Sequence, residues 1–262
     1  MQSMSLDNAL WFAGIMAEAA VVGLLIYRRV WRTLPVFCLY CFWDLFGNAG
    51  LYPVVRLLPA SYLTAYLAET IVDSILEFGV LVELAWSVLR PFRTFLPRGS
   101  LAVVGGFVAV LGAAIWPIAT IPGFGNLPPE LHLLMRLEQT TAILRVLLFL
   151  ALAGCSQVLS ISWRDRELQV ATGLGFYSLA SLVVAMLHTH QKMGPVYNHL
   201  EQVVVASGLC SFLYWVFSFA QQEAERREFS PQMQSALLAV AGAARTARVA
   251  LTDSAPDKTR KR

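Results

Sequence analysis

The sequence predicts an all-α membrane protein, a bundle of seven transmembrane helices with its N-terminus outside and its C-terminus in the cytoplasm. Of the 262 residues, 57% are hydrophobic and only 14% are charged, whereas soluble domains carry about 25% charged residues. Seven apolar stretches each come close to the ~20 residues that are needed to cross a bilayer. Arginines gather in alternate connections between these stretches.

The seven stretches lie at residues 8–27, 34–52, 62–88, 101–121, 131–156, 168–188 and 199–220. The segment 1–8 contains no Lys or Arg, so it lacks the basic start of a cleaved signal peptide. We therefore expect the first stretch to be a retained helix. Residues 1–222 form the predicted transmembrane domain. Residues 223–262 form a predicted cytoplasmic tail, partly amphipathic and then disordered.

The distribution of positive charge predicts the orientation. The loops after the first, third, fifth and seventh stretches carry clusters of arginine. The loops on the other side of the membrane contain only Arg56 and Lys192. The arginine clusters are Arg28, Arg29 and Arg32; Arg90, Arg93 and Arg98; Arg164 and Arg166; and Arg226 and Arg227. The positive-inside rule places them in the cytoplasm. We therefore expect a multi-pass protein of the plasma (inner) membrane, whose partners are the lipid bilayer and a cytoplasmic protein that contacts the basic inner loops.

The third stretch is unusual because it is acidic. A charged side chain at the centre of a bilayer costs at least ~2.5 kcal/mol, so polar residues at this depth indicate a function by default. At about 100° per residue, the polar side chains fall within roughly a third of the helix circumference. They are Tyr62, Tyr66, Glu69, Asp73, Glu77 and Glu83. We expect this stripe to face the interior of the bundle.

Other stretches carry polar residues at the same depth, counted at about 1.5 Å per residue. The resulting predicted set for ligand or ion binding is Glu18, Asp44, Asn48, Tyr66, Glu69, Asp73, Glu77, Glu138 and Arg145. Arg145 can neutralise one carboxylate of the third stretch, but the acids at mid-depth outnumber this one base. The surplus predicts a cavity that binds a proton, a cation or a small polar ligand. The alternative is that the polar groups only hold the helices together.

Metal and cofactor chemistry has weaker support. The histidines, together with one glutamate, cluster at the predicted outer rim, but no pair on one helix has a strong ligand spacing. These weak metal candidates are His132, His188, His190, His199 and Glu201. The four cysteines lie within predicted spans, which favours packing over disulfides or metal binding. They are Cys38, Cys41, Cys155 and Cys210. We expect no cofactor and no nucleic-acid partner.

The chain lacks the motifs of several known classes of seven-helix membrane protein. Lysines occur only at 192, 258 and 261, so the seventh stretch cannot form a retinal Schiff base. The third stretch ends in Ser87-Val-Leu-Arg90 instead of the acidic-Arg-aromatic triplet of G-protein-coupled receptors. No metalloprotease-like or serine-protease motif occurs in the membrane domain. The sequence therefore favours a protein that is not an enzyme.

The chain resembles a family of uncharacterised bacterial seven-helix integral membrane proteins. The motifs that carry the resemblance are Arg28-Arg29…Arg32…Pro35-Val-Phe37, Tyr62…Tyr66…Glu69…Glu83, Arg145, Ser162-Trp-Arg-Asp165 and Gly173-Leu-Gly-Phe176. The resemblance covers most of the membrane domain. It implies the fold and the topology, and it implies no activity, substrate or catalytic residue.

Four functions remain compatible with these features. The first is a non-enzymatic sensor or binding module with an acidic mid-membrane cavity. The second is a proton- or cation-coupled transporter subunit that uses the same acids as carriers. The third is a structural or assembly protein, and the fourth is an intramembrane metal-dependent hydrolase that uses the histidine rim. The sequence favours the first and leaves the ligand and the oligomeric state open.

Overall fold

The computed structural model describes residues 2–57, 62–88, 99–119, 129–155, 165–188 and 195–221. These residues form seven α-helices and one turn of 3₁₀ helix, with no β-strand among them. Four stretches of the described helices are long and apolar enough to cross a membrane: Ala9–Tyr27, Arg136–Gly154, Arg166–Leu187 and Gln202–Ala220. The predictions of an all-α fold and of helices able to span a membrane are confirmed.

The helices follow the predicted stretches closely. They are α1 (Gln2–Tyr27), η1 (Val30–Arg32), α2 (Pro35–Leu57), α3 (Tyr62–Val88), α4 (Ser100–Ile115), α5 (Pro129–Cys155), α6 (Arg166–His188) and α7 (Pro195–Ala220). The fourth prediction was too long, because α4 ends at Ile115 and the chain enters a turn. Pro117 explains this end, since proline has no N–H to donate and its ring restricts the preceding residue.

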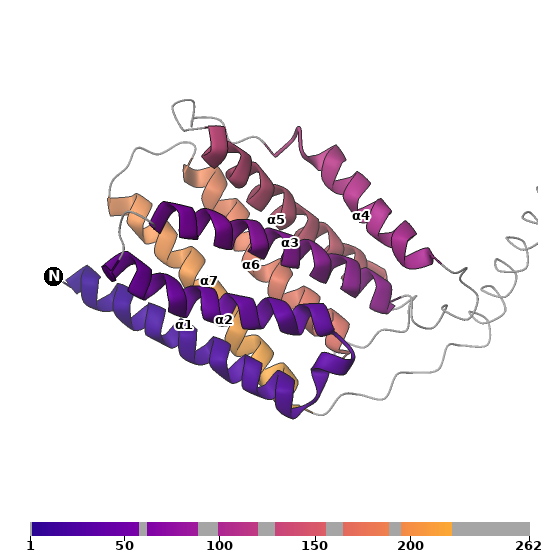
Figure 1. Ribbon diagram of the computed structural model, residues 1–262, viewed down its shortest axis with the longest axis horizontal. Helices are drawn as coiled ribbons and strands as arrows, with labels where there is room; N and C mark the ends of the chain where they lie inside the picture. The colour runs from indigo at the N-terminus through magenta and orange to yellow at the C-terminus, as the bar shows by residue number, and fades with distance from the viewer. Residues whose placement is uncertain are drawn as a thin grey trace, which may run out of the picture.

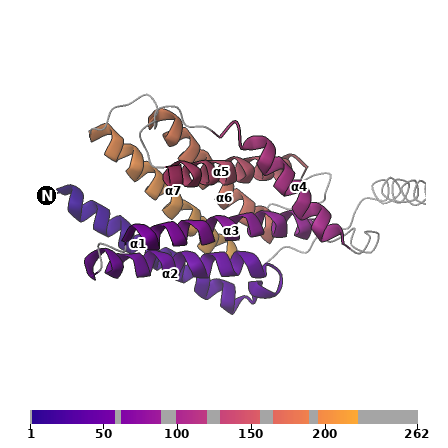
Figure 2. The same cartoon turned by 45° about the horizontal axis from the view of Figure 1, so that its top comes forward.

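Six helices form a closed ring, and α4 lies outside it. Around the ring, α1 contacts α2 and α7, α3 contacts α2 and α5, and α6 contacts α5 and α7. Among the described helices, α4 packs against α3 and α5, and both views place it at the edge of the bundle (Figures 1 and 2). Its side chains Val103, Phe107 and Val110 are 70%, 64% and 67% exposed. Such an apolar surface is suited to contact with lipid.

Contacts between helix ends show how the helices alternate in direction. Arg28 donates a hydrogen bond to the carbonyl of Ala220, so α1 and α7 end on the same side of the bundle. The Ser87 hydroxyl donates to Glu167 Oε1 at 2.7 Å, which joins the end of α3 to the start of α6. We call this side of the bundle the arginine end, because it carries Arg28, Arg29, Arg32 and Arg166.

The start of α2 is capped at the arginine end by a carboxylate from α3. Glu83 Oε1 accepts from the N–H of Val36 at 2.9 Å, and Oε2 accepts from the N–H of Phe37 at 2.8 Å. The first N–H groups of a helix have no partner within the helix, and the helix dipole favours a negative charge there. Pro35, the first residue of α2, has no N–H to satisfy. Glu83 therefore has a structural role, although it belongs to the stripe predicted for function.

The core near the arginine end is aromatic. Phe37 of α2 is fully buried, with its ring centroid 5.2 Å from that of Trp215 and 6.1 Å from that of Phe219, both on α7. The indole N–H of Trp215 donates to the carbonyl of Gln169 on α6 at 3.2 Å. This cluster joins three helices that are distant in sequence.

Close contact between α6 and α7 depends on a glycine. A Cβ atom added at Gly173 would lie 2.3 Å from Nε1 of Trp215. The hydroxyl of Ser211 donates to the carbonyl of Gly173 at 3.0 Å. No side chain larger than hydrogen fits at this position without moving the indole.

Replacing Gly173 by Ala is expected to lower the free energy of unfolding by about 1–3 kcal/mol, the usual cost of overpacking a core. Gly23→Ala is the matched control, because a Cβ there meets nothing within 4 Å. Thermal unfolding of both variants in the same detergent measures the difference. Equal melting temperatures would show that the indole moves without cost.

Candidate functional site

A buried ion pair lies at the middle of the bundle. Arg145 of α5 donates through Nη1 to Oε1 of Glu77 on α3. The two side chains are only 6% and 8% exposed. The guanidinium also lies 5.7 Å from the ring centroid of Tyr177 on α6, which allows a cation–π contact. The expectation that Arg145 neutralises one carboxylate of the third stretch agrees with this geometry.

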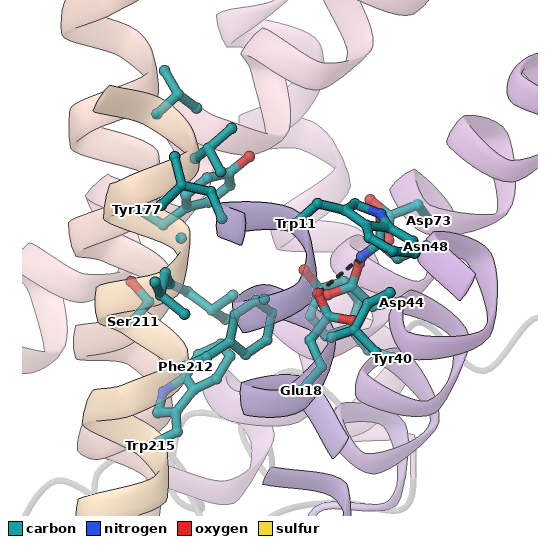
Figure 3. A pocket seen from close by; sticks show the side chains of 18 of the residues that line it. Trp11, Glu18, Tyr40, Asp44, Asn48, Asp73, Tyr177, Ser211, Phe212 and Trp215 are labelled. Carbon is teal, nitrogen blue, oxygen red and sulfur yellow. Dashed lines mark hydrogen bonds between the residues drawn. The ribbon is translucent and has the colours of Figure 1, made fainter. Parts of the chain in front are cut away.

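Beside the ion pair lies a cavity of about 350 Å³, enclosed by α1, α2, α3, α6 and α7. Its polar lining consists of Glu18, Tyr40, Asp44, Asn48, Asp73, Glu77, Tyr177 and Ser211. The remaining lining is apolar or glycine, from Leu10, Trp11, Gly14, Ile15, Leu174, Val204, Val205, Gly208, Leu209, Phe212 and Trp215. Figure 3 shows the acids on one side and the residues of α7 on the other. The cavity therefore has an acidic wall and an apolar, partly aromatic wall.

One amide links two acids of the acidic wall. Asn48 donates through Nδ2 to Oε1 of Glu18 at 2.9 Å and to Oδ1 of Asp44 at 3.2 Å (Figure 3). Asp44 and Asn48 are four residues apart on α2, so they share one helix face. Because the amide is neutral, it positions both carboxyl groups without compensating their charge.

Two carboxyl oxygens of this wall have no hydrogen-bond partner among the described residues. They are Oε2 of Glu18 and Oδ1 of Asp73, and both atoms are buried. Glu18 as a whole is 5% exposed. A buried carboxylate without a counter-charge is strongly unfavourable, and it must gain either a proton or a nearby cation. These acids must therefore bind a proton or face a cation in the cavity, because the described guanidinium beside it, Arg145, already binds Glu77.

The structure thus brings together many of the residues in the predicted binding set. Glu18, Asp44, Asn48, Asp73 and Glu77 line the same cavity. Arg145 adjoins it through its bond to Glu77. These residues come from α1, α2, α3 and α5, as the depth count along the sequence predicts.

Three members of the predicted set lie elsewhere. Tyr66 and Glu69 are half-buried on α3 and do not line the cavity. A Cβ at Gly47 would lie 3.0 Å from Oε1 of Glu69, so this carboxyl packs beside α2. The side chain of Glu138 is exposed on α5, two turns before Arg145.

The position of Tyr66 and Glu69 along α3 explains why they do not line the cavity. At about 100° per residue, Tyr66 shares a face with Asp73 and Glu77, but it precedes Asp73 by seven residues, about 10 Å along the helix axis. Glu69 precedes Asp73 by one turn, and its carboxyl group packs beside Gly47 of α2. Of the described residues in the predicted stripe, Asp73 and Glu77 line the cavity.

The predicted histidine rim stays a prediction. His199 is exposed, with Nδ1 3.3 Å from Oε1 of Gln202. His190 and the side chains of His132, His188 and Glu201 lie outside the described residues. Within the described part of the chain, no group of three or more His, Cys, Asp or Glu is placed to hold a metal ion.

The aromatic lining of the cavity is missing from the predicted binding set. Tyr40 was detectable, because Tyr40, Asp44 and Asn48 are spaced by four residues and so share one face of α2. Tyr177 follows Gly173 by the same spacing on α6. Phe212 and Trp215 carried no signal, since aromatic residues are common along every predicted span.

No protein-family model, curated protein or solved structure matches the chain. The chemistry of the site is therefore inferred from its own residues. These provide a cavity large enough for a small molecule, an acidic wall with uncompensated carboxyl oxygens and an apolar wall opposite.

Replacing Arg145 by Met leaves Glu77 as a buried acid without its partner, and we expect a loss of about 3–5 kcal/mol in the free energy of unfolding. Adding Glu77→Gln to this variant should recover most of the loss. Arg136→Met is the matched control, because Arg136 is exposed on the same helix. Denaturant unfolding in one detergent measures all four proteins. Equal losses in the single and double variants would contradict a dominant role for the ion pair.

Proposed function

We propose that this protein is a non-enzymatic sensor or binding module of the membrane whose cavity binds a positively charged ligand. One observation carries the proposal: Glu18 and Asp73 place buried carboxyl oxygens, without partners among the described residues, at the wall of a cavity of about 350 Å³. Glu77, on the same helix as Asp73, has its charge matched by Arg145. A cation in the cavity would compensate part of the charge of the three remaining acids, Glu18, Asp44 and Asp73.

The same observation favours binding over a purely structural role. Polar groups that only hold helices together are worth most when they are fully hydrogen-bonded to each other. Glu77 is paired with Arg145, whereas Glu18 and Asp73 each retain a buried oxygen with no described partner. The cavity helices α1, α2, α3, α6 and α7 each run as one continuous helix. Transporters commonly use broken helices at the substrate site, so continuity supports binding without transport.

Seven spans and an outside N-terminus are part of the proposal. The helices α2 and α3 have 23 and 27 residues, which exceeds the ~20 that cross a bilayer. They also carry acids of the cavity and, on α3, the capping residue Glu83. The arginine end then lies in the cytoplasm of a bacterial cell, by the positive-inside rule. The uncharacterised bacterial family that the sequence resembles fits this topology.

The topology is testable with reporter fusions. We expect a C-terminal fusion to green fluorescent protein to fluoresce and a C-terminal fusion to alkaline phosphatase to be inactive in a bacterial host. A phosphatase fused after residue 57, between α2 and α3, should be active. An inactive phosphatase at that position together with an active one at the C-terminus would reverse the proposed orientation.

A route from the cavity to a cytoplasmic partner is built from packed aromatic rings. Trp215 lines the cavity and packs edge-on against Phe37 near the start of α2. The N–H of Phe37 in turn donates a hydrogen bond to Oε2 of Glu83. A ligand that shifts Trp215 would therefore act on the connection that carries the exposed residues Arg29 and Arg32. We propose that a cytoplasmic protein recognises this connection.

Replacing Asp73 by Asn is expected to stabilise the ligand-free protein by about 1 kcal/mol, because it removes a negative charge from a buried oxygen that has no described partner. The same change should abolish stabilisation by added cations. Thermal unfolding at pH 8, with sodium, potassium, ammonium and alkylammonium chlorides at equal ionic strength, measures both effects. Glu18→Gln should behave in the same way.

Glu138→Gln is the matched control, because this carboxylate is exposed and outside the cavity. It should leave the melting temperature and its response to cations unchanged. Loss of stability in Asp73→Asn, with no cation response in the unmodified protein, would instead favour the structural role of the acids.

A further inference from the structure

We infer that the ligand of the cavity is an organic ammonium ion with an apolar substituent, and that inorganic cations are not its natural occupants. This inference rests on the proposed function and goes beyond it by naming the chemical class of the ligand. It depends on three features of the cavity: its size, the difference between its two walls and the way its carboxyl groups are spread.

The size of the cavity exceeds what a single metal ion requires. Pockets for small organic molecules measure about 300–1,000 Å³, and this cavity measures about 350 Å³. Na⁺, Ca²⁺ and similar ions bind instead where several oxygens converge at about 2.0–2.6 Å. Among the described residues, no three carboxylate, His or Cys groups converge in that way. The acids come from three helices and line one side of a larger volume.

The two walls match the two parts of such a ligand. Glu18, Asp44 and Asp73 form the acidic wall, which suits an ammonium group (Figure 3). Buried Glu18 contributes a carboxyl oxygen without a described partner to this wall. Opposite them, α7 presents Phe212 and Trp215 (Figure 3). Aromatic rings attract ammonium ions through cation–π contact and also bury apolar substituents.

The cavity extends away from the arginine end. Trp215, packed on Phe37, lines its part nearer the arginine end. Leu10 and Trp11 belong to the first half of α1, and Val204 to the first half of α7. These residues line the part farther from the arginine end, which the proposed topology places toward the outside of the cell.

The test uses benzyltrimethylammonium chloride as the probe, on the full-length protein in detergent. Benzyl alcohol serves as the neutral match, and sodium and caesium chlorides serve as inorganic matches at equal ionic strength. We expect the ammonium probe alone to raise the melting temperature saturably, and Asp73→Asn to abolish its effect. Isothermal titration calorimetry supplies the dissociation constant.

The apolar wall is tested by one substitution. Phe212→Leu should weaken binding of the probe about three- to tenfold, because it removes an aromatic face while keeping the site apolar. Phe217→Leu on the same helix is the matched control, since Phe217 is 71% exposed and does not line the cavity. Size-exclusion chromatography verifies that both variants are folded. If Phe212→Leu fails to fold, the comparison of the ammonium probe with benzyl alcohol and the inorganic salts on the unmodified protein still tests the inference.

The outcomes separate the inference from the proposed function. If sodium or caesium stabilises the protein through Asp73 and the ammonium probe does not, the inference is wrong and the proposed function stands. If no cation has an effect that depends on Asp73, both are wrong. If benzyl alcohol acts as strongly as the ammonium probe, the cavity recognises only apolar groups, and the inference fails. Equal affinities of the Phe212→Leu and unmodified proteins would show that the aromatic face of Phe212 does not bind the ammonium ion, and this part of the inference would be wrong.

Discussion

The ion pair between Arg145 and Glu77 is the interaction on which the rest of the interior depends. A guanidinium inside an apolar bundle is tolerated only beside a carboxylate, because each charge alone would lose its hydration without compensation. This pair fixes α3 against α5 and sets the rotation of α3 about its axis. Asp73 lies one turn from Glu77, so the same rotation directs its carboxyl group toward the cavity. Tyr177, beside the guanidinium, adds α6 to the arrangement.

The carboxyl groups inside this molecule have different partners, and these partners determine whether each group stabilises or destabilises the fold. Glu77 is matched by a cation, and Glu83 accepts two backbone N–H groups at the start of α2. Both therefore stabilise the fold. Glu18 and Asp73 keep a buried oxygen without a described partner. A group that costs stability in this way is typical of sites where the fold is arranged for a ligand.

The cavity and the arginine end are adjacent, which would give the proposed binding event a route to the surface. The aromatic rings of Phe37, Trp215 and Phe219 lie between them and pack edge to face. A packed interior transmits displacement because it has few voids. At Gly173 there is no free space beside the indole, since Trp215 lies directly against the backbone of this glycine. Movement of the indole on binding would therefore be passed to α2 and α6 instead of being absorbed locally.

By itself the sequence determined the helices, because apolar stretches of about 20 residues and the breaks between them are local properties. The segment 62–88 was predicted to the residue. It also determined which acids share a depth, since helical rise is constant. Only the tertiary structure decided rotation and neighbours. In the folded protein, Glu69 and Glu138 lie outside the cavity, and Glu83 caps the start of α2. Phe212 and Trp215 of α7 lie opposite Glu18 of α1. Those outcomes depend on contacts between helices that are distant in sequence, and no local pattern encodes them.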